Sequence, residues 1–250
     1  MAGKRLVLFG AGMTGRGQVS QLAFEDGWTL TLVDKNEQLV KKLRDAGKYT
    51  VHLLSAHPRD VIIDEFDIYH TSENDAITQA VSQADLIITS VLEPNLQDVA
   101  VTLSQALSGR FLNQVFTPLN IVAAENMNNS STRLKEYVKA SIDKTWISIL
   151  DEMVGFPDSM IARVVPVAND PLNLYAEEFS EWTADLTAVK GNAPLLKGLE
   201  WITNQTARLQ RKLYIHNTGH AVCGYFGWLK GYTYIHEAAQ DADIMQRISE

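Results

Sequence analysis

A glycine-rich segment near the amino end restricts the possible folds of this chain more than any other feature. The segment, GAGMTG at residues 10–15, follows an apolar run at residues 6–9 that is typical of a strand buried on both faces. It precedes residues 18–24, where apolar residues recur at the spacing of a helix. A strand, the pattern Gly-x-Gly-x-x-Gly and a helix, in this order, indicate a turn that binds the phosphates of a dinucleotide. The alternative is a glycine-rich turn that binds no ligand. The strand before the turn and the helix after it argue strongly against this alternative.

Each glycine of this fingerprint loop has its own expected role. Gly10 permits the tight turn, Gly12 lets the backbone approach a pyrophosphate, and Gly15 lets the helix pack close to the strand. The pyrophosphate would lie at the amino end of the helix, where free N–H groups favour anions. The other residues predicted to line the cofactor here are Ala11, Met13, Thr14 and Arg16.

A carboxylate is predicted at the ribose of the cofactor. A second strand, expected over residues 28–33, ends at Asp34, nineteen residues after Gly15. A carboxylate at this position binds the adenosine ribose hydroxyls, and it would repel the 2′-phosphate of NADP. The neighbouring Lys35 is an opposing observation, because a cation would partly accommodate that phosphate. The sequence therefore predicts NAD as the cofactor.

Strands and helices alternate through the first two thirds of the chain. Helices are predicted over residues 37–46, 74–83 and about 95–107, the last stopping at Gly109, and strands over residues 49–54, 61–69, 85–91 and 119–124. This alternation is typical of an α/β fold, here a Rossmann-type doubly wound parallel sheet. Ligands of such sheets bind at the carboxyl ends of the strands, so Thr89 and Ser90 are predicted beside the cofactor.

The pattern changes in the last third of the chain. Short strands are expected over residues 160–165 and 172–176, and helices over residues 199–216, 220–230 and 235–248. We therefore predict two domains. Residues 1–185 form an NAD-binding Rossmann-type domain with additional strands, and residues 186–250 begin a mainly α-helical second domain.

Composition argues against several classes of function. The 250 residues are 46% hydrophobic, and a net charge of -8 argues against a general surface for nucleic acid. No apolar run approaches the length of a membrane span, so we expect no membrane partner. The residues before the first predicted strand leave no room for a signal peptide.

Cysteine and histidine usage bounds the chemistry further. The single cysteine, Cys223, excludes an internal disulfide and favours a cytoplasmic location. The six histidines show no metal-ligand spacing, so no metal is predicted.

A second informative stretch, RKLYIHNTGH, covers residues 211–220. On one unbroken helix Lys212 and Asn217 would be roughly 140° apart, too far to serve one site. Asn217-Thr218-Gly219 is typical of a helix end, and a break there would let Lys212, Asn217 and His220 converge. Alternatively, Lys212 complements a helix carboxyl end, Asn217 only caps a helix, and His220 packs in a core. The residues alone support a shared functional site and these purely structural roles about equally.

The chain resembles the polyol-specific long-chain dehydrogenases over essentially its whole length. The resemblance is most specific at Arg211-Lys212-Leu213 followed by Asn217-Thr218-Gly219-His220, which matches the family's Lys-x4-Asn-x2-His signature. The other segments that carry it are the fingerprint loop through Gly17, PLNI at 118–121 with Glu125-Asn126, VGF at 154–156 with Asp158-Ser159, RVVP at 163–166, NDPL at 169–172 and EFSEW at 178–182.

The resemblance implies a metal-independent, NAD-dependent oxidation of a secondary alcohol. It implies that Lys212 is the general acid–base, with a pKa lowered toward neutrality by burial near a cationic ring. Asn126 and Asn217 would donate hydrogen bonds to the substrate oxygen, and His220 would hold a neighbouring hydroxyl or position the lysine.

The implied substrate is a small polyol or polyol phosphate. The leading expectation is interconversion of mannitol 1-phosphate and fructose 6-phosphate. The alternatives are an unphosphorylated hexitol, a sugar acid such as fructuronate or altronate, and a non-catalytic NAD-binding sensor. The oligomeric state stays open between monomer and dimer.

The resemblance implies further helices beyond the point where this sequence stops, which close the substrate pocket in family members. It therefore implies that residues 186–250 are the start of a helical substrate and catalytic domain that is incomplete here. Residues 242–249 are predicted as a helix without a stop signal. Without those helices we expect exposed apolar side chains at Ile235, Ala238, Ile244 and Ile248, intact NAD binding, and weak or no turnover of mannitol 1-phosphate.

Overall fold

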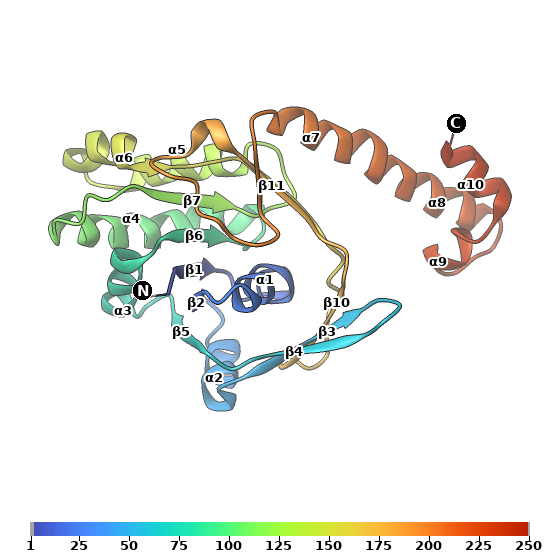
Figure 1. Ribbon diagram of the computed structural model, residues 1–250, viewed down its shortest axis with the longest axis horizontal. Helices are drawn as coiled ribbons and strands as arrows, with labels where there is room; N and C mark the ends of the chain where they lie inside the picture. The colour runs from blue at the N-terminus through green and yellow to red at the C-terminus, as the bar shows by residue number, and fades with distance from the viewer. Residues whose placement is uncertain (1–2, 250) are drawn as a thin grey trace. The chain divides into compact units, whose positions relative to one another are not determined.

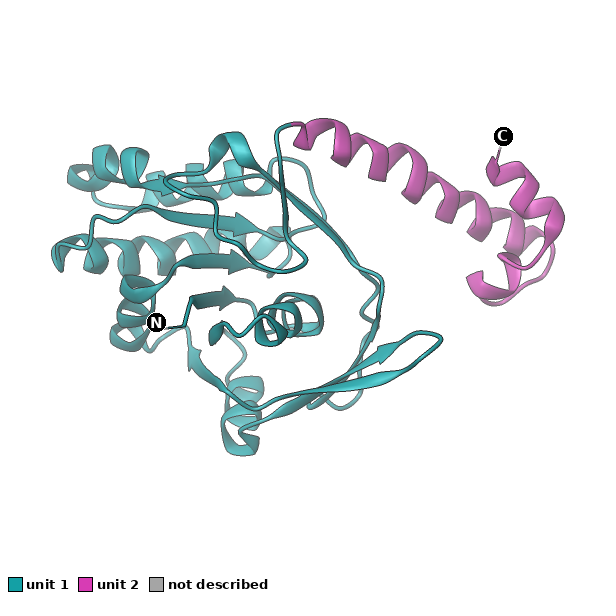
Figure 2. Ribbon diagram, in the orientation of Figure 1, with its two compact units in different colours: residues 1–203 teal, residues 204–250 magenta. Residues whose placement is uncertain are grey.

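The computed structural model describes residues 3–249 and divides the chain into two compact units, Met1–Thr203 and Asn204–Glu250 (Figure 2). The two largest hydrophobic clusters lie in the first unit, and a small third cluster lies in the second. The domain boundary predicted after residue 185 separates the residues expected to bind the cofactor from those expected to bind the substrate. This division of roles stays a prediction.

A parallel sheet of six strands is the centre of the first unit (Figure 1). Its strands are β1 (Arg5–Phe9), β2 (Thr29–Asp34), β5 (Phe66–His70), β6 (Leu86–Thr89), β7 (Leu119–Ala123) and β8 (Val154–Gly155). Their order is β5-β2-β1-β6-β7-β8, and each neighbouring pair is parallel. This is the strand order of a doubly wound dinucleotide-binding sheet, so the predicted fold class is confirmed. The order reverses between β1 and β6, and ligands of such sheets bind at this switch point.

Helices cover both faces of this sheet, because its strands are apolar on both sides. Leu6 and Leu8 of β1 join one hydrophobic cluster, whereas Val7 and Phe9 join the other. This alternation follows from the two-residue period of a strand. The helices of this unit are α1 (Gln21–Glu25), α2 (Glu37–Ala46), α3 (Asn74–Gln83), α4 (Leu96–Leu112), α5 (Ser130–Ser141) and α6 (Ile147–Met153), with short 3-10 turns η2 (Glu93–Asn95), η3 (Lys144–Trp146) and η4 (Leu186–Ala188).

Two smaller sheets complete the first unit. One contains β3 (Tyr49–Leu54), β4 (Arg59–Ile63) and β10 (Asn173–Glu177), and the other contains β9 (Ser159–Ala162), β11 (Glu181–Asp185) and β12 (Glu200–Ile202). In the first of these, β10 pairs in parallel with β3, which joins segments far apart in the sequence (Figure 1).

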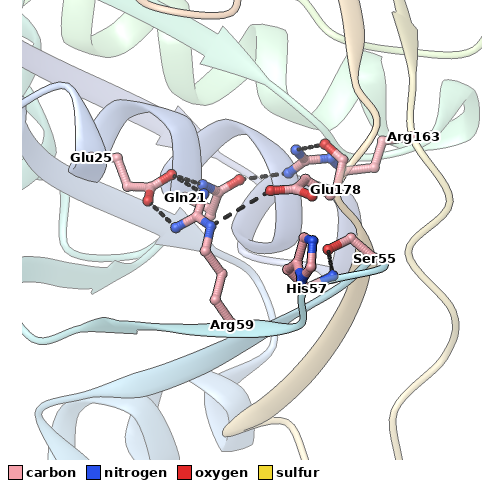
Figure 3. A network of polar contacts seen from close by, with 7 residues as sticks. All are labelled: Gln21, Glu25, Ser55, His57, Arg59, Arg163 and Glu178. Carbon is pink, nitrogen blue, oxygen red and sulfur yellow. Dashed lines mark hydrogen bonds and ion pairs between the residues drawn. The ribbon is translucent and has the colours of Figure 1, made fainter.

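A polar network ties the β3–β4 hairpin to α1 and to the end of β10 (Figure 3). Arg59 donates to Glu25 and lies 3.7 Å from a carboxylate oxygen of Glu178. Arg163 donates to the Gln21 side chain at 2.6 Å and to the Glu178 carbonyl at 3.2 Å. The helix that follows the fingerprint loop is therefore fixed to the second sheet through charged hydrogen bonds.

Two predicted boundaries in the first unit are wrong. The segment 61–69, predicted as one strand, is divided between β4 and β5, which belong to different sheets. The helix predicted to stop at Gly109 continues to Leu112. A Cβ on Gly109 would lie 2.3 Å from the methyl carbon of Thr78 in α3. This glycine therefore permits close helix packing and does not end the helix.

The second unit is helical, with α7 (Gln205–Arg211), the π-helical segment η5 (Lys212–Asn217), α8 (Thr218–Leu229), α9 (Ile235–Ala238) and α10 (Ala242–Ser249). The helix predicted from residue 199 begins later, because residues 200–202 form β12. The predicted break at Asn217 is also wrong. Asn217 has φ -67° and ψ -37°, which are helical values, and η5 runs directly into α8.

Exposure in this unit also differs from expectation at three of four positions. Ala238 and Ile244 are buried with Cys223, whereas Ile235 is exposed and Ile248 is partly buried against that cluster. The apolar surface is carried mainly by other side chains, namely Tyr214, Ile215, Tyr225, Trp228, Leu229 and Tyr234. None of the helices in residues 3–249 is long and apolar enough to cross a membrane.

Candidate functional site

The fingerprint loop follows β1 at the switch point of the sheet. Gly10 has φ +96°, and a Cβ there would lie 2.1 Å from the Ser90 carbonyl oxygen, so only glycine fits. A Cβ on Gly15 would lie 2.2 Å from the Gly10 carbonyl oxygen, which shows how closely the helix approaches the strand end. A Cβ on Gly12, in contrast, would meet nothing within 4 Å. The backbone of Gly12 is thus open to a ligand, as a pyrophosphate requires.

The first helix is wider than an α-helix where it follows the loop. The segment η1 (Gly15–Ser20) is π-helical and continues directly into α1. Every side chain of η1 is buried, while Met13 and Thr14 before it are half-buried. Short π segments inside α-helices occur often at functional sites.

Arg16 faces the protein interior. Its side chain is fully buried, its Nε donates to the Ala11 carbonyl at 2.6 Å, and its guanidinium donates to the Pro171 carbonyl and lies 5.2 Å from the Tyr49 ring centre. These contacts brace the loop from inside. The predicted contact of Arg16 with the cofactor has no support from the direction of its side chain.

Asp34 lies at the end of β2 against the same loop. One carboxylate oxygen accepts from the Ala11 N–H at 2.8 Å, and the other accepts from the Asn36 N–H at 2.8 Å. Lys35 is directed to η2 and α4, where its Nζ lies 2.7 Å from the side-chain oxygen of Asn95 in η2 and 3.3 Å from the carboxylate of Asp98 in α4. Lys35 is therefore engaged away from the Asp34 carboxylate, which weakens the argument that it would accommodate a 2′-phosphate.

The carboxyl ends of β6 and β7 form the opposite side of the switch point. Thr89 is fully buried and Ser90 is half-buried, and the Ser90 N–H donates to the Phe9 carbonyl at 2.7 Å. Asn126 lies two residues beyond Ala124, exposed between β7 and α5. The structure thus brings together the loop, Asp34, Ser90 and the β7 end at one edge of the sheet.

Glu125 lies at the same edge of the sheet, and the sequence predicts no role for it. It is only 6% exposed, and its two carboxylate oxygens accept from the Val91 N–H at 2.7 Å and the Leu92 N–H at 3.0 Å. Burial raises the pKa of Glu125 to about 7, although the two backbone hydrogen bonds lower it. The only signal in the sequence is a carboxylate directly after an apolar strand. Its burial and its partners come from the tertiary structure.

The predicted proton-transfer residues lie in the second unit. Lys212 is buried at 8% exposure, Asn217 is half-buried, and the exposed His220 packs its ring edge-to-face on His216 at 4.5 Å. In a π-helix the N–H of residue i+5 donates to the carbonyl of residue i. Two residues five positions apart therefore lie about one helical turn apart on the same face. Lys212 and Asn217 have this spacing in η5, and His220 follows Asn217 by three residues in α8. The π segment therefore places the three residues on one face of an unbroken helix.

No group of three or more His, Cys, Asp or Glu side chains suited to a metal ion occurs among residues 3–249. The expectation that the reaction needs no metal stays a prediction.

Comparisons with known proteins cover both units. Residues 4–198 match the family model described as the mannitol dehydrogenase Rossmann domain, and residues 207–250 match the mannitol dehydrogenase C-terminal domain. A curated mannitol-1-phosphate 5-dehydrogenase of Bacillus licheniformis is 32% identical over 245 residues, which cover 96% of this chain and 64% of that protein. The chain thus spans less than two thirds of the length of this relative.

Solved structures of several dehydrogenases have a similar fold. A D-sorbitol dehydrogenase in substrate-free form aligns with a TM-score of 0.82 at 17% identity, over 97% of this chain and 63% of that chain. An octopine dehydrogenase with NADH and L-arginine aligns with a TM-score of 0.59 at 12% identity, over 92% of this chain and 56% of that chain.

Proposed function

The chain belongs to the mannitol dehydrogenase family, and on this basis we propose that it is an NAD-dependent oxidoreductase that interconverts mannitol 1-phosphate and fructose 6-phosphate. The observation that carries the proposal is the 32% identity to a mannitol-1-phosphate 5-dehydrogenase over 96% of this chain. The dinucleotide fingerprint loop at the switch point supports it independently.

The residues of the first unit fit NAD. Gly12 leaves its backbone open for the pyrophosphate, and the Asp34 carboxylate lies against the loop where the ribose hydroxyls would bind. NADH-bound structures among the relatives of similar fold are consistent with this choice. When bound, NAD supplies the acceptor for the hydride that leaves the alcohol carbon.

In this proposal Lys212 takes the hydroxyl proton of the substrate as the hydride leaves, and it returns the proton in the reverse direction. Asn217 and Asn126 donate hydrogen bonds to the oxygen that gains negative charge. His220 holds an adjacent hydroxyl or orients the lysine. The one-turn spacing of Lys212 and Asn217 supports a shared target for these two side chains.

A second candidate substrate is an unphosphorylated hexitol, which the D-sorbitol dehydrogenase fold favours. The test is NADH formation with mannitol 1-phosphate, mannitol, sorbitol and altronate, with calorimetric NAD binding on the same sample. Mannitol 1-phosphate should give the highest kcat/KM. If only an unphosphorylated polyol is turned over, that polyol replaces mannitol 1-phosphate as the proposed substrate. NAD binding without turnover of any of these substrates would favour a non-catalytic sensor.

Asp34 should determine the preference for NAD over NADP. In Asp34→Ala the ratio of the two dissociation constants should narrow by about tenfold, about 1.4 kcal/mol, because the carboxylate no longer repels the 2′-phosphate. Fluorescence titration with both nucleotides measures this ratio. Asp45→Ala is the control, because Asp45 is an exposed residue of α2 paired with Lys41. Tighter binding of NADP than of NAD by the unmodified chain would contradict the prediction.

A further inference from the structure

The turn at residues 90–92 contains one packed and one strained, exposed side chain: Val91 packs against a hydrophobic cluster, whereas Leu92 does not. Leu92 has φ 69° and ψ 147°, a conformation that side chains other than glycine rarely adopt. Its side chain is 73% exposed, so little packing compensates for this strain. The bonds from the Val91 and Leu92 N–H groups to Glu125 hold one side of the turn. On the other side, the Asn95 amide donates to the Val91 carbonyl at 2.6 Å.

This turn is also a wall of the fingerprint loop. The Ser90 carbonyl and the Val91 side chain come so close to Gly10 that a Cβ there would lie 2.1 Å and 2.7 Å from them. The Ser90 N–H is bonded to Phe9, the last residue of β1. A shift of the turn would therefore move or release the first glycine of the loop.

We propose that Glu125 is a positioning residue whose ionised carboxylate holds the 90–92 turn against the fingerprint loop, so that NAD binds best when Glu125 is charged. An ionised carboxyl group accepts at both oxygens, whereas a protonated one becomes a donor at one of them. Protonation of Glu125 therefore releases or weakens one of the two backbone bonds. This inference rests on the proposed NAD binding.

The charge of Glu125 changes in the neutral range, because burial raises its pKa to about 7. The ion pairs on η2, α4 and α5 include Glu93 with Arg133, Asp98 with Lys35, and Lys135 and Lys139 with Asp151 of α6. None of them is among the causes of the raised pKa. Because the carboxylate forms as the pH rises, NAD affinity should rise with it. The dissociation constant should fall about tenfold from pH 6 to pH 8, as expected for one ionisation near 7.

The binding test compares the unmodified chain with Glu125→Gln across this pH range. Glutamine keeps the shape but has one acceptor oxygen, so its binding should be weaker at pH 8 and should lose the tenfold pH dependence. Glu93→Gln is the matched control, because it removes an exposed carboxylate from the same turn region and should keep the pH profile. Adding Leu92→Gly to Glu125→Gln should restore affinity, since glycine adopts the turn conformation without strain.

A second measurement observes the turn without cofactor. The dipeptide Val-Leu occurs twice in the chain, at Val7-Leu8 and Val91-Leu92. Carbonyl-¹³C valine combined with ¹⁵N leucine therefore selects the amide signals of Leu8 and Leu92. The Leu92 signal should titrate with a midpoint near 7 and lose this transition in Glu125→Gln, while Leu8 in β1 stays constant.

The outcomes separate the two proposals. A Leu92 amide that does not titrate, or NAD affinity that is flat with pH in the unmodified chain, overturns the role of Glu125 and leaves the proposed function intact. Absence of NAD binding at every pH overturns the proposed function, and with it the link between this turn and the cofactor.

Discussion

Replacing Lys212 by methionine should reduce turnover by about 10²–10⁴-fold, the usual contribution of a general acid–base, while NAD affinity stays nearly unchanged. Methionine matches the length of the buried lysine stem but accepts no proton. The cofactor is held in this proposal by the fingerprint loop and Asp34, which belong to the other unit. Steady-state rates and calorimetric NAD binding on the same preparation measure the two effects separately.

A lysine of the same unit supplies the control for this substitution. Lys230 is exposed and paired with Asp241 and Asp243, and exposed ion pairs contribute little to stability. Lys230→Met should therefore keep its turnover. In Lys212→Ala, added primary amines should restore part of the rate, which loss of structure alone would not allow. Full activity of Lys212→Met would remove the lysine from the mechanism.

The second large effect concerns two glycines of the fingerprint loop with opposite consequences. Gly12→Ala should weaken NAD binding by about tenfold or more, about 1.4 kcal/mol, because the new methyl group occupies the space of the pyrophosphate. The free energy of unfolding should not fall, since a Cβ at Gly12 meets nothing within 4 Å of the protein. Calorimetry and denaturant unfolding measure the two quantities.

Gly15→Ala should lower the free energy of unfolding by about 1–3 kcal/mol, the usual cost of overpacking. Its Cβ would lie 2.2 Å from a backbone oxygen of Gly10, and backbone moves less readily than a side chain. Gly27→Ala is not a suitable control for the cost of overpacking at Gly15. Gly27 has φ +75°, so an alanine there would add backbone strain of its own. If Gly12→Ala unfolds the chain, or binds NAD normally, the loop does not hold the pyrophosphate as proposed.

The central sheet could be predicted from the sequence because its signals are local. Apolar strands, the glycine pattern and Asp34 lie close together in the chain, and the order β5-β2-β1-β6-β7-β8 follows the usual rule for such units. The pairing of β10 with β3 was not predictable in the same way, because those strands are more than a hundred residues apart.

The sequence predicts the candidate site less completely than it predicts the central sheet. The role of a charged side chain depends on whether the fold buries it, and burial has no local signal. Arg16 follows the last fingerprint glycine, and its contact with the cofactor stays a prediction. The sequence does not predict that its guanidinium lies inside the protein and donates to the Ala11 and Pro171 carbonyls. The sequence places Glu125 only within a motif, whereas the structure shows that its carboxylate joins the ends of two strands. Neither environment has a signature in the adjacent residues.

If Lys212, Asn217 and His220 act together as proposed, the π segment at Lys212–Asn217 makes the length of this helix, and not only its side chains, a condition for function. A π turn contains one residue more than the α turn it replaces, so deletion of one residue such as Ile215 would restore a regular helix. The face carrying Asn217 and His220 would then rotate by about 100° relative to Lys212. A one-codon deletion could in this way leave a well-folded helix and separate the lysine from its partners. Relatives that retain the three side chains but lack this extra residue would be candidates for a lost or altered activity.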